Sequence, residues 1–236
     1  MREPGPAGRR RDFIVYRLGS GPGVVFGSAR SGVAPPYGRG GPSRIRRAWA
    51  QRFILASACA SFAPSVPVIV LQTDRLSLRL MSLDDAGFIV ELLNDPAFLR
   101  FIGDKGVRTA DDARQYISTG PLASYARHGF GLWVVELKGS GRPLGICGLL
   151  KRETLNDVDI GFAFLPRYRS QGYAFESAAA VMDYARTVLG LGRIVAIAND
   201  DNAGSRRVLE KIGMGFERMI RLSDDGPEIR LLASDA

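Results

Sequence analysis

The feature that most restricts the fold of this chain is a strand, a short turn and a long helix that follow one another directly over residues 158–189. The apolar run VDIGFAFLP predicts the strand, and Ala178, Val181 and Ala185 recur at helical spacing after it. Between the two elements lies RYRSQGYA (167–174), which has a glycine and a small residue where the helix is expected to begin. The sequence therefore predicts a helix amino terminus beside the end of a strand.

This helix start has the properties of an anion-binding site. The first backbone N–H groups of a helix have no partner inside the helix, and the helix dipole favours negative charge there. Gly172 lacks a Cβ and Ala174 is small, so a ligand could approach the main chain closely. Arg167 and Arg169 add permanent positive charge suited to phosphate oxygens. On these residues alone, a pyrophosphate cradle and an ordinary turn with solvated arginines both stay open.

Before this stretch, the chain predicts one strand and two helices. VLQTDRLSLRLM alternates apolar and polar residues as a half-buried strand does. Ser82 with an acid three residues later begins the first helix, and Pro96 ends it. Thr109 begins the second helix, which we expect to continue towards His128.

The other elements follow in a regular order. FGLWVVELK and LGICGLLKR predict two strands before VDIGFAFLP, and RIVAIAN predicts a strand after the long helix. NAGSRRVLEKIG predicts a helix with Asn202 as its N-cap and Gly213 at its carboxyl end. FERMIRLS and EIRLLAS flank a DDGP turn and predict a final hairpin.

Residues 1–68 form a leader of different composition. Residues 1–70 contain 11 Arg, no Lys and two acids, a net charge of +9, whereas residues 71–236 have a net charge of −1. The first 70 residues also contain 10 Gly and 8 Pro, so we expect the leader to be mostly disordered. The basic segment 44–65 resembles a signal peptide but begins far from Met1, and a short amphipathic surface helix is the alternative interpretation.

Charge and cysteine usage narrow the function classes further. The near-neutral main part argues against nucleic-acid binding as its central activity. No apolar stretch approaches the ~20 residues of a membrane helix, and we expect a cytoplasmic protein. Cys59 and Cys147 have neither zinc-site nor disulfide-framework spacing, so we interpret them as ordinary buried or neutral thiols.

Three segments together resemble the GNAT superfamily of acyl-CoA-dependent N-acetyltransferases. RSQGYA (169–174) matches its R/Q-x-x-G-x-G/A signature, and NDDNAGSRRVLEKIGMGFE resembles the N-x-x-S-x-x-V-L-E-K-x-G block that follows one strand later. TDRLSLRLM resembles the first strand of the subfamily that contains ribosomal-protein N-terminal acetyltransferases. The resemblance covers roughly residues 70–236.

The resemblance implies an α/β (α+β) fold with a mixed, mostly antiparallel sheet of about seven strands and about four flanking helices. Two strands would splay apart at the acyl-CoA site. We therefore expect a GNAT domain over residues 69–236.

The resemblance also implies where acetyl-CoA binds. The pyrophosphate would lie on the loop of the signature, and the pantetheine arm would follow the edge of the strand before it. Core packing is the alternative role for the aromatic residues of that strand, and N-capping is the alternative for Asn202. The implied cofactor-binding residues are Phe162, Ala163, Phe164, Leu165, Arg167, Arg169, Ser170, Gln171, Gly172, Tyr173, Ala174, Asn202 and Ser205.

The implied reaction is direct attack of a neutral amine on the acetyl thioester in a ternary complex, without a metal. An alkyl ammonium must lose a proton first, and Asp159 is the base we consider first, ahead of Glu136 and Glu228. Many GNAT enzymes have a tyrosine as proton donor where this chain has Leu209. Ser205 or water is therefore the candidate donor.

We expect transfer of an acetyl group to a primary amine of a small molecule or a protein N-terminus. One alternative is an acyl-CoA-binding protein without turnover, and another is ribosome or nucleic-acid association through the leader. The acceptor stays open between a ribosomal-protein N-terminus, a free amino acid, a polyamine and an antibiotic. Assembly as a homodimer is also left open.

Overall fold

A computed structural model describes residues 67–224 and 226–234 of the chain. The predictions made for residues 1–66 lie outside the described residues. They include disorder of the leader, the helix at 44–65 and the state of Cys59.

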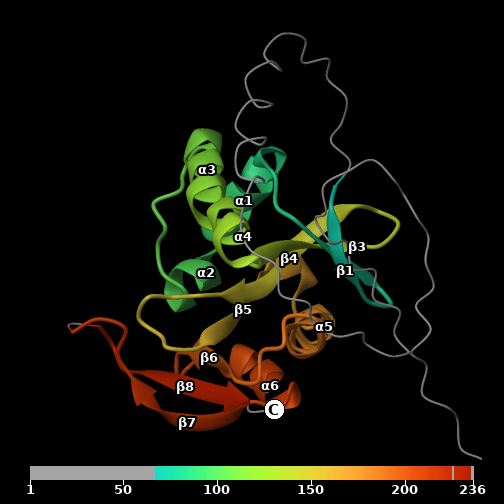
Figure 1. The fold of residues 1–236 in the computed structure, drawn as a ribbon. Coiled ribbons are helices and arrows are strands. Elements are labelled where there is room, and N and C mark those ends of the chain that lie inside the picture. The colour runs from blue at the N-terminus through green and yellow to red at the C-terminus, as the bar shows by residue number, and fades with distance from the viewer. Residues whose placement is uncertain (1–66, 225, 235–236) are drawn as a thin grey trace, which may run out of the picture. The chain divides into compact units, whose positions relative to one another are not determined.

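The described chain is built on one eight-stranded sheet with the order β1-β2-β3-β4-β5-β6-β8-β7 (Figure 1). Neighbouring strands are antiparallel except for β5 and β6, which are parallel because α5 connects them. This confirms the mixed, mostly antiparallel sheet. The strands are β1 (Ile69–Gln72), β2 (Leu76–Arg79), β3 (Leu132–Leu137), β4 (Arg142–Leu150), β5 (Val158–Phe164), β6 (Ile194–Ala198), β7 (Gly215–Ile220) and β8 (Ile229–Ser234).

The helices lie on both faces of this sheet. α1 to α4 are on one side, and α5 and α6 are on the other (Figure 1). The helical segments are η1 (Leu83–Asp85), α1 (Ala86–Leu93), α2 (Pro96–Phe101), α3 (Ala110–Ile117), η2 (Ser118–Leu122), α4 (Ala123–His128), η3 (Pro166–Tyr168), α5 (Tyr173–Thr187) and α6 (Ala203–Lys211).

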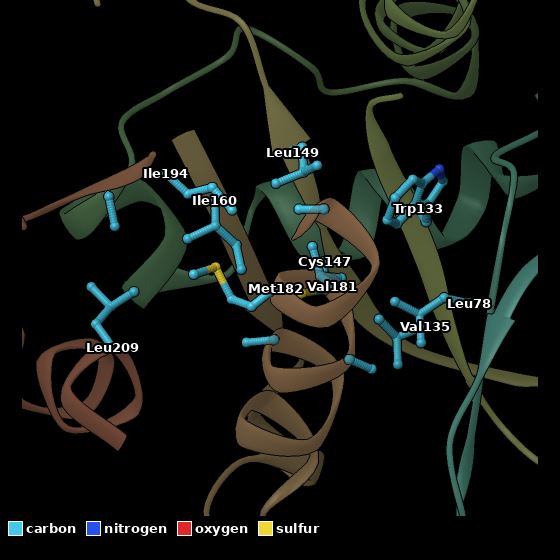
Figure 2. Packing of buried hydrophobic residues seen from close by; sticks show 14 of the residues in the cluster. Leu78, Trp133, Val135, Cys147, Leu149, Ile160, Val181, Met182, Ile194 and Leu209 are labelled. Carbon is cyan, nitrogen blue, oxygen red and sulfur yellow. The ribbon is translucent and has the colours of Figure 1, made fainter. Parts of the chain in front are cut away.

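Each face of the sheet has its own hydrophobic core. On the α5 side, Val181 and Met182 of the helix pack among strand residues that include Val135, Cys147 and Ile160 (Figure 2). On the other side, α1, α2 and α3 pack over a second cluster that includes Val134, Ile146 and Leu165. Successive strand residues therefore alternate between two cores, so β5 presents Ile160 to one face and Asp159 to the other.

The predicted thiol assignment holds for Cys147. It is fully buried in the α5-side core, and burial raises the pKa of its thiol to about 12. The side chain therefore acts as a small core residue rather than as a nucleophile.

The first predicted strand is in fact two. β1 and β2 form an antiparallel hairpin, so the sheet has one strand more than expected. β2 is also buried on both faces rather than half-buried. Its polar face is covered because Arg79 forms ion pairs with Asp85 and Glu136, each with a 2.7 Å contact.

Both predicted helix starts are present. Asp85 accepts a hydrogen bond from the Ser82 backbone at 2.8 Å, and Thr109 and Asp112 form a capping box. Pro96 follows the end of α1 but also begins α2, which Asp95 caps, so the first predicted helix is two. The second predicted helix continues to His128 through a π-helical turn that contains Pro121.

Candidate active site

The site is built where β5 and β6 separate. The two parallel strands pair only at Val158↔Ile194 and Asp159↔Val195, although both strands continue beyond these pairs. β5 stays paired with β4 from Asp159 up to Phe164. The edge of β5 that faces β6 therefore has no strand partner from Ile160 onwards.

A cleft of about 1230 Å³ opens at this separation. It is lined by β5 and β6, by the starts of α5 and α6, and by α2, α3 and the β7–β8 loop. Because it includes Phe164 from the α5-side core and Phe98 from the α1–α3 side, it reaches both faces of the sheet. The predicted site residues that line it are Asp159, Phe162, Ala163, Phe164, Arg169, Ser170, Gly172, Tyr173, Ala174, Asn202 and Ser205.

The start of α5 is open to a ligand. Gly172 is the N-cap with φ 84° and ψ −4°, a left-handed conformation that glycine adopts without strain, and Ser170 also has a positive φ of 59°. Within the described part of the chain, the backbone N–H groups of residues 170–175 donate no hydrogen bond. Six N–H donors are thus left free at or just before the positive end of a 15-residue helix.

Arg167 and Arg169 are both paired with carboxylates. Arg169 donates from Nε to the Phe164 carbonyl at 2.9 Å, and its Nη2 pairs with the buried Asp95. Arg167 pairs with Glu91 and is not among the residues that line the cleft. In this arrangement Arg169 fixes the loop to the cap of α2, and Arg167 lies outside the cleft.

Two other predicted residues also lie outside the cleft lining. Leu165 is buried in the core on the α1–α3 side, with 1% exposure. Gln171 is exposed, and its side chain donates to the Arg167 carbonyl at 2.8 Å. At Gln171, only the backbone N–H can take part in the anion site.

Sequence reasoning missed Arg75, which approaches the loop from the β1–β2 hairpin. Its Nε pairs with Glu176 at 2.7 Å, and its Nη1 donates to the Gln171 carbonyl at 3.2 Å. Its Nη2 lies 3.2 Å from the position that a Cβ of Gly172 would occupy, and its guanidinium stacks on Tyr173. No local pattern indicates this residue, because its contacts join positions about 100 residues apart.

The aromatic residues of β5 pack in the core and also line the cleft. Phe164 is part of the α5-side core with 5% exposure, and Phe162 packs against the same core. Both also line the cleft. Core packing therefore accounts for their apolar character, and their exposed parts form the wall beside the free edge of β5.

Asn202 caps α6 as predicted. Its Oδ1 accepts a hydrogen bond from the Ser205 backbone N–H at 3.1 Å, and its Nδ2 donates none within the described residues. Capping thus leaves the amide donors free for a ligand. Ser205 lies in the first turn of α6 and lines the cleft. The buried Leu209 lies about one turn further along the helix.

Asp159 is the carboxylate buried in this cleft. It has 1% exposure, Arg152 Nε contacts its Oδ2 at 2.9 Å, and its Oδ1 is buried with no hydrogen-bond partner among the described residues. Burial raises the pKa of Asp159, although the charge of Arg152 acts in the opposite direction. A buried carboxylate with one free oxygen and a raised pKa is suited to accept a proton.

The other acid–base candidates are not in the cleft. Glu136 is held by Arg79 on the far part of β3, and Glu228 pairs with Arg221 at 3.3 Å. His128 ends α4 and stacks on Phe130. None of the three lines the cleft.

Sequence reasoning also missed the residues on the α1–α3 side of the cleft, namely Lys105, Tyr116 and Arg152. They come from three separate segments, so no spacing indicates them. A second hollow of about 190 Å³ begins at the same place and is lined by Tyr116, Arg152 and the π-helical turn. The hollow and the cleft share Tyr116, Leu132, Leu150 and Arg152 in their linings.

Neither a metal site nor a membrane span was found in the described ranges. No cluster of three His, Cys, Asp or Glu residues with metal-binding geometry occurs in residues 67–224 and 226–234. Over the same residues, every helix is too short or too polar to cross a membrane.

The family follows from comparison with known proteins. Residues 75–215 match the model of the acetyltransferase (GNAT) domain. The chain belongs to the GNAT acetyltransferase family. It is therefore an acetyltransferase, and GNAT domains use acetyl-CoA as the donor.

Individual relatives agree with this family. The chain is 33% identical over 154 residues to the uncharacterized protein YkkB of Bacillus subtilis, covering 64% of this chain and 88% of YkkB. A GNAT-family acetyltransferase structure from Bacillus anthracis has a TM-score of 0.59 and 26% identity, covering 72% of this chain and 98% of that one. The ribosomal L7/L12 α-N-protein acetyltransferase RimL shares the fold, with a TM-score of 0.63 and 15% identity over 74% of this chain and 97% of that one.

Proposed function

We propose that this GNAT protein transfers the acetyl group of acetyl-CoA to a primary amine by direct attack in a ternary complex. One observation carries the proposal. An unpartnered helix start, a free strand edge and a buried carboxylate with a free oxygen all line the same cleft. The first two features suit the donor, and the third suits an amine.

On the donor side, the free backbone N–H groups of residues 170–174 would hold the pyrophosphate at the start of α5, whereas the Arg169 N–H already donates to the Pro166 carbonyl. The edge of β5 from Phe162 to Leu165 would pair with the amide groups of the pantetheine arm, because these strand positions have no partner on the β6 side. Asn202 would add its Nδ2 donors from the start of α6. Acetyl-CoA supplies an activated thioester when it is bound in this way.

On the acceptor side, Asp159 would accept the proton that an ammonium must lose. The amine nitrogen then forms a bond with the thioester carbonyl carbon, and the carbon–sulfur bond breaks. The products are the N-acetylated amine and CoA. The raised pKa of Asp159 improves its match to a proton donor with a pKa near ~10.

The leaving thiolate also needs a proton. Leu209 cannot supply one, and Ser205 lies in the cleft wall one turn before it. We assign the donor role to Ser205 or to a water molecule that it binds. Ser205→Ala should then lower turnover more than it lowers the affinity for acetyl-CoA.

An acyl-CoA-binding protein without turnover is the second candidate, since the tyrosine acid is absent. The third is association with ribosomes or nucleic acid through the leader, which predicts steeply salt-dependent binding. The domain boundary at residue 68/69, the cytoplasmic location and the homodimer stay predictions.

Calorimetric titration with acetyl-CoA tests the donor site. In Gly172→Val the new side chain meets Arg75 and the left-handed backbone becomes strained, so affinity should fall at least about tenfold. Gly139→Ala is the matched control, because Gly139 also has a positive φ of 79° but lies in the β3–β4 turn. Equal affinity of the wild type and Gly172→Val for acetyl-CoA would overturn the assignment of the pyrophosphate site to the start of α5. Binding of acetyl-CoA without CoA release on any amine would favour the second candidate.

A further inference from the structure

The cleft wall on the α1–α3 side has an unusual set of charges. Asp159 provides one negative charge and Arg152 and Lys105 provide two positive charges, while Arg100 of α2 is paired with Asp201, which also lines the cleft. Both cations line the cleft, and Tyr116 lies beside them. The wall therefore has an excess of positive charge where an amine, itself a cation before it is deprotonated, has to enter.

Neither cation is fully neutralised by the protein. Arg152 uses Nε for Asp159, and its terminal N–H groups make no hydrogen bond with the described residues. Lys105 Nζ has no hydrogen bond or ion pair within those residues either. Its sequence neighbour Asp104 is not available, because both oxygens of Asp104 are bound by Arg108 and one also by the Gly106 N–H.

The two cations also affect each other. Partial desolvation lowers the pKa of Lys105, and the charge of Arg152 lowers it further. Asp159 contacts Arg152 but not Lys105, which is exposed and has no carboxylate partner among the described residues, so a bound anion would relieve the repulsion between the two cations. This part of the cleft is thus prepared for a negative group.

The same wall also requires a hydrogen-bond donor. Asp159 has 1% exposure, and its buried Oδ1 has no partner among the described residues. A buried carboxylate oxygen without a donor costs free energy, and a substrate N–H group would supply the missing bond.

From these two needs we infer that the acceptor is a small amine that also bears a carboxylate, that is, a free amino acid. Its nitrogen lies at Asp159 Oδ1, and its carboxylate lies between Arg152 and Lys105. Its side chain would extend towards the second hollow, which shares Tyr116 and Arg152 with the cleft lining. The inference rests on the proposed acetyl transfer, and it disfavours polyamines and peptide N-termini, which have no carboxylate next to the amine.

The test compares acceptors in matched pairs with the full-length protein and acetyl-CoA. Glycine, L-alanine, L-leucine and β-alanine are each compared with the corresponding amide, and spermidine and a C-terminally amidated peptide complete the panel. We expect kcat/KM for the acids to exceed that for the amides by about tenfold or more, as for a hydrogen bond to a charged group. Lys105→Gln should remove most of this preference.

Arg127→Gln is the matched control, because this exposed cation on α4 lines neither the cleft nor the second hollow. It should leave the preference unchanged. Equal or better use of the amides, spermidine or the peptide would overturn the inference. An equal loss for acids and amides in Lys105→Gln would also overturn it.

Calorimetric binding of L-leucine and L-leucinamide to the CoA-bound protein separates this inference from the proposed function. Tighter binding of the acid that depends on Lys105 supports the anion site even when no acceptor is acetylated, and in that case only the proposed function fails. Equal binding of the two probes, or no binding of the acid, overturns the inference.

Discussion

Asp159 combines a buried Oδ1 that has no partner with a pKa that burial has raised. The protein stabilises this costly arrangement with a single contact from Arg152. A buried carboxylate of this kind is expected where the free oxygen is needed for a substrate. Its place in the cleft, at the last pair of β5 and β6, makes it the residue on which turnover should depend most.

Asp159→Asn should lower kcat by about 10²-fold or more, because the amide cannot accept the amine proton. Affinity for acetyl-CoA should stay the same, since Asp159 is on the acceptor side. In the wild type, kcat/KM should rise with pH through the raised pKa of Asp159. Steady-state thiol release and calorimetry check these points, and an active Asp159→Asn variant would exclude Asp159 as the base.

The same substitution should change how stability depends on pH. Because the pKa of Asp159 is raised in the folded protein, the stability linked to its proton is present below the ordinary value of 3.8 and is lost as pH rises through the folded value. The free energy of unfolding of the wild type should therefore fall relative to Asp159→Asn over this range. Urea titrations measure it, with Asp111→Asn, whose side chain is 91% exposed, as the control.

Residues whose role is local could be predicted from the sequence. Gly172 and Asn202 are helix-end residues, and both stand where their neighbours indicated. Arg75, Lys105 and Arg152 could not be found in this way, because only the tertiary fold brings Arg75 to the loop before α5 and the other two to the cleft. The charge of Arg167 and Arg169 suggested phosphate contact, and the structure shows that each is paired with a carboxylate, which the sequence did not indicate.

At the scale of elements, the start of α6 joins a structural and a proposed binding role in Asn202. A serine at position 202 can still cap α6, because its side-chain oxygen also accepts a hydrogen bond from the helix N–H groups. It cannot supply the two N–H donors of the Asn202 Nδ2. Asn202→Ser should therefore change the free energy of unfolding by less than about 0.5 kcal/mol. It should still weaken acetyl-CoA binding. An unchanged affinity would mean that capping is the only role of Asn202.

The ion pairs of Arg79 connect β2 to η1 and β3. All three side chains are at most 14% exposed, so removing the cation leaves two largely buried carboxylates without a cationic partner. Arg79→Ala should destabilise the protein by about 3 kcal/mol or more. Arg108→Ala is the control, because its pair with Asp104 is exposed and should contribute less than about 1 kcal/mol. Denaturant unfolding compares them, and equal effects would contradict a structural role for the Arg79 cluster.

The order of elements could be predicted because hydrophobic spacing and helix caps are local signals. The element boundaries that the sequence did not predict are those that a tertiary contact or a cap at a proline determines. The β1–β2 hairpin could not be separated from one long strand, because Thr73 and Arg75 at its turn are held by Glu176 of α5. Likewise, Asp95 makes Pro96 the first residue of a new helix rather than a stop.

At the scale of the whole molecule, the cleft reaches both faces of the sheet through the separation of β5 and β6. The α5 side carries the helix start proposed for the donor, and the α1–α3 side carries the charges proposed for the acceptor. Each substrate then has its own route to the thioester, which suits a ternary complex.

We expect the leader to contribute nothing to this chemistry. A variant that begins at residue 67 should keep the melting temperature, the acetyl-CoA affinity and the turnover of the full chain, because the predicted site residues all follow that position. Thermal denaturation and thiol release compare the two proteins. A loss of turnover in the shorter protein would give the leader a role in the reaction.

Direct transfer from acetyl-CoA to an amine is the central activity that we propose for this protein. The decisive measurement supplies acetyl-CoA labelled in its acetyl group and quantifies CoA and N-acetylated amine by mass spectrometry in one reaction. We predict equal amounts of the two products and no acetyl group on the protein, with both products lost in Asp159→Asn. CoA release without acetylated amine, or a labelled acetyl group that passes through the protein, would contradict it.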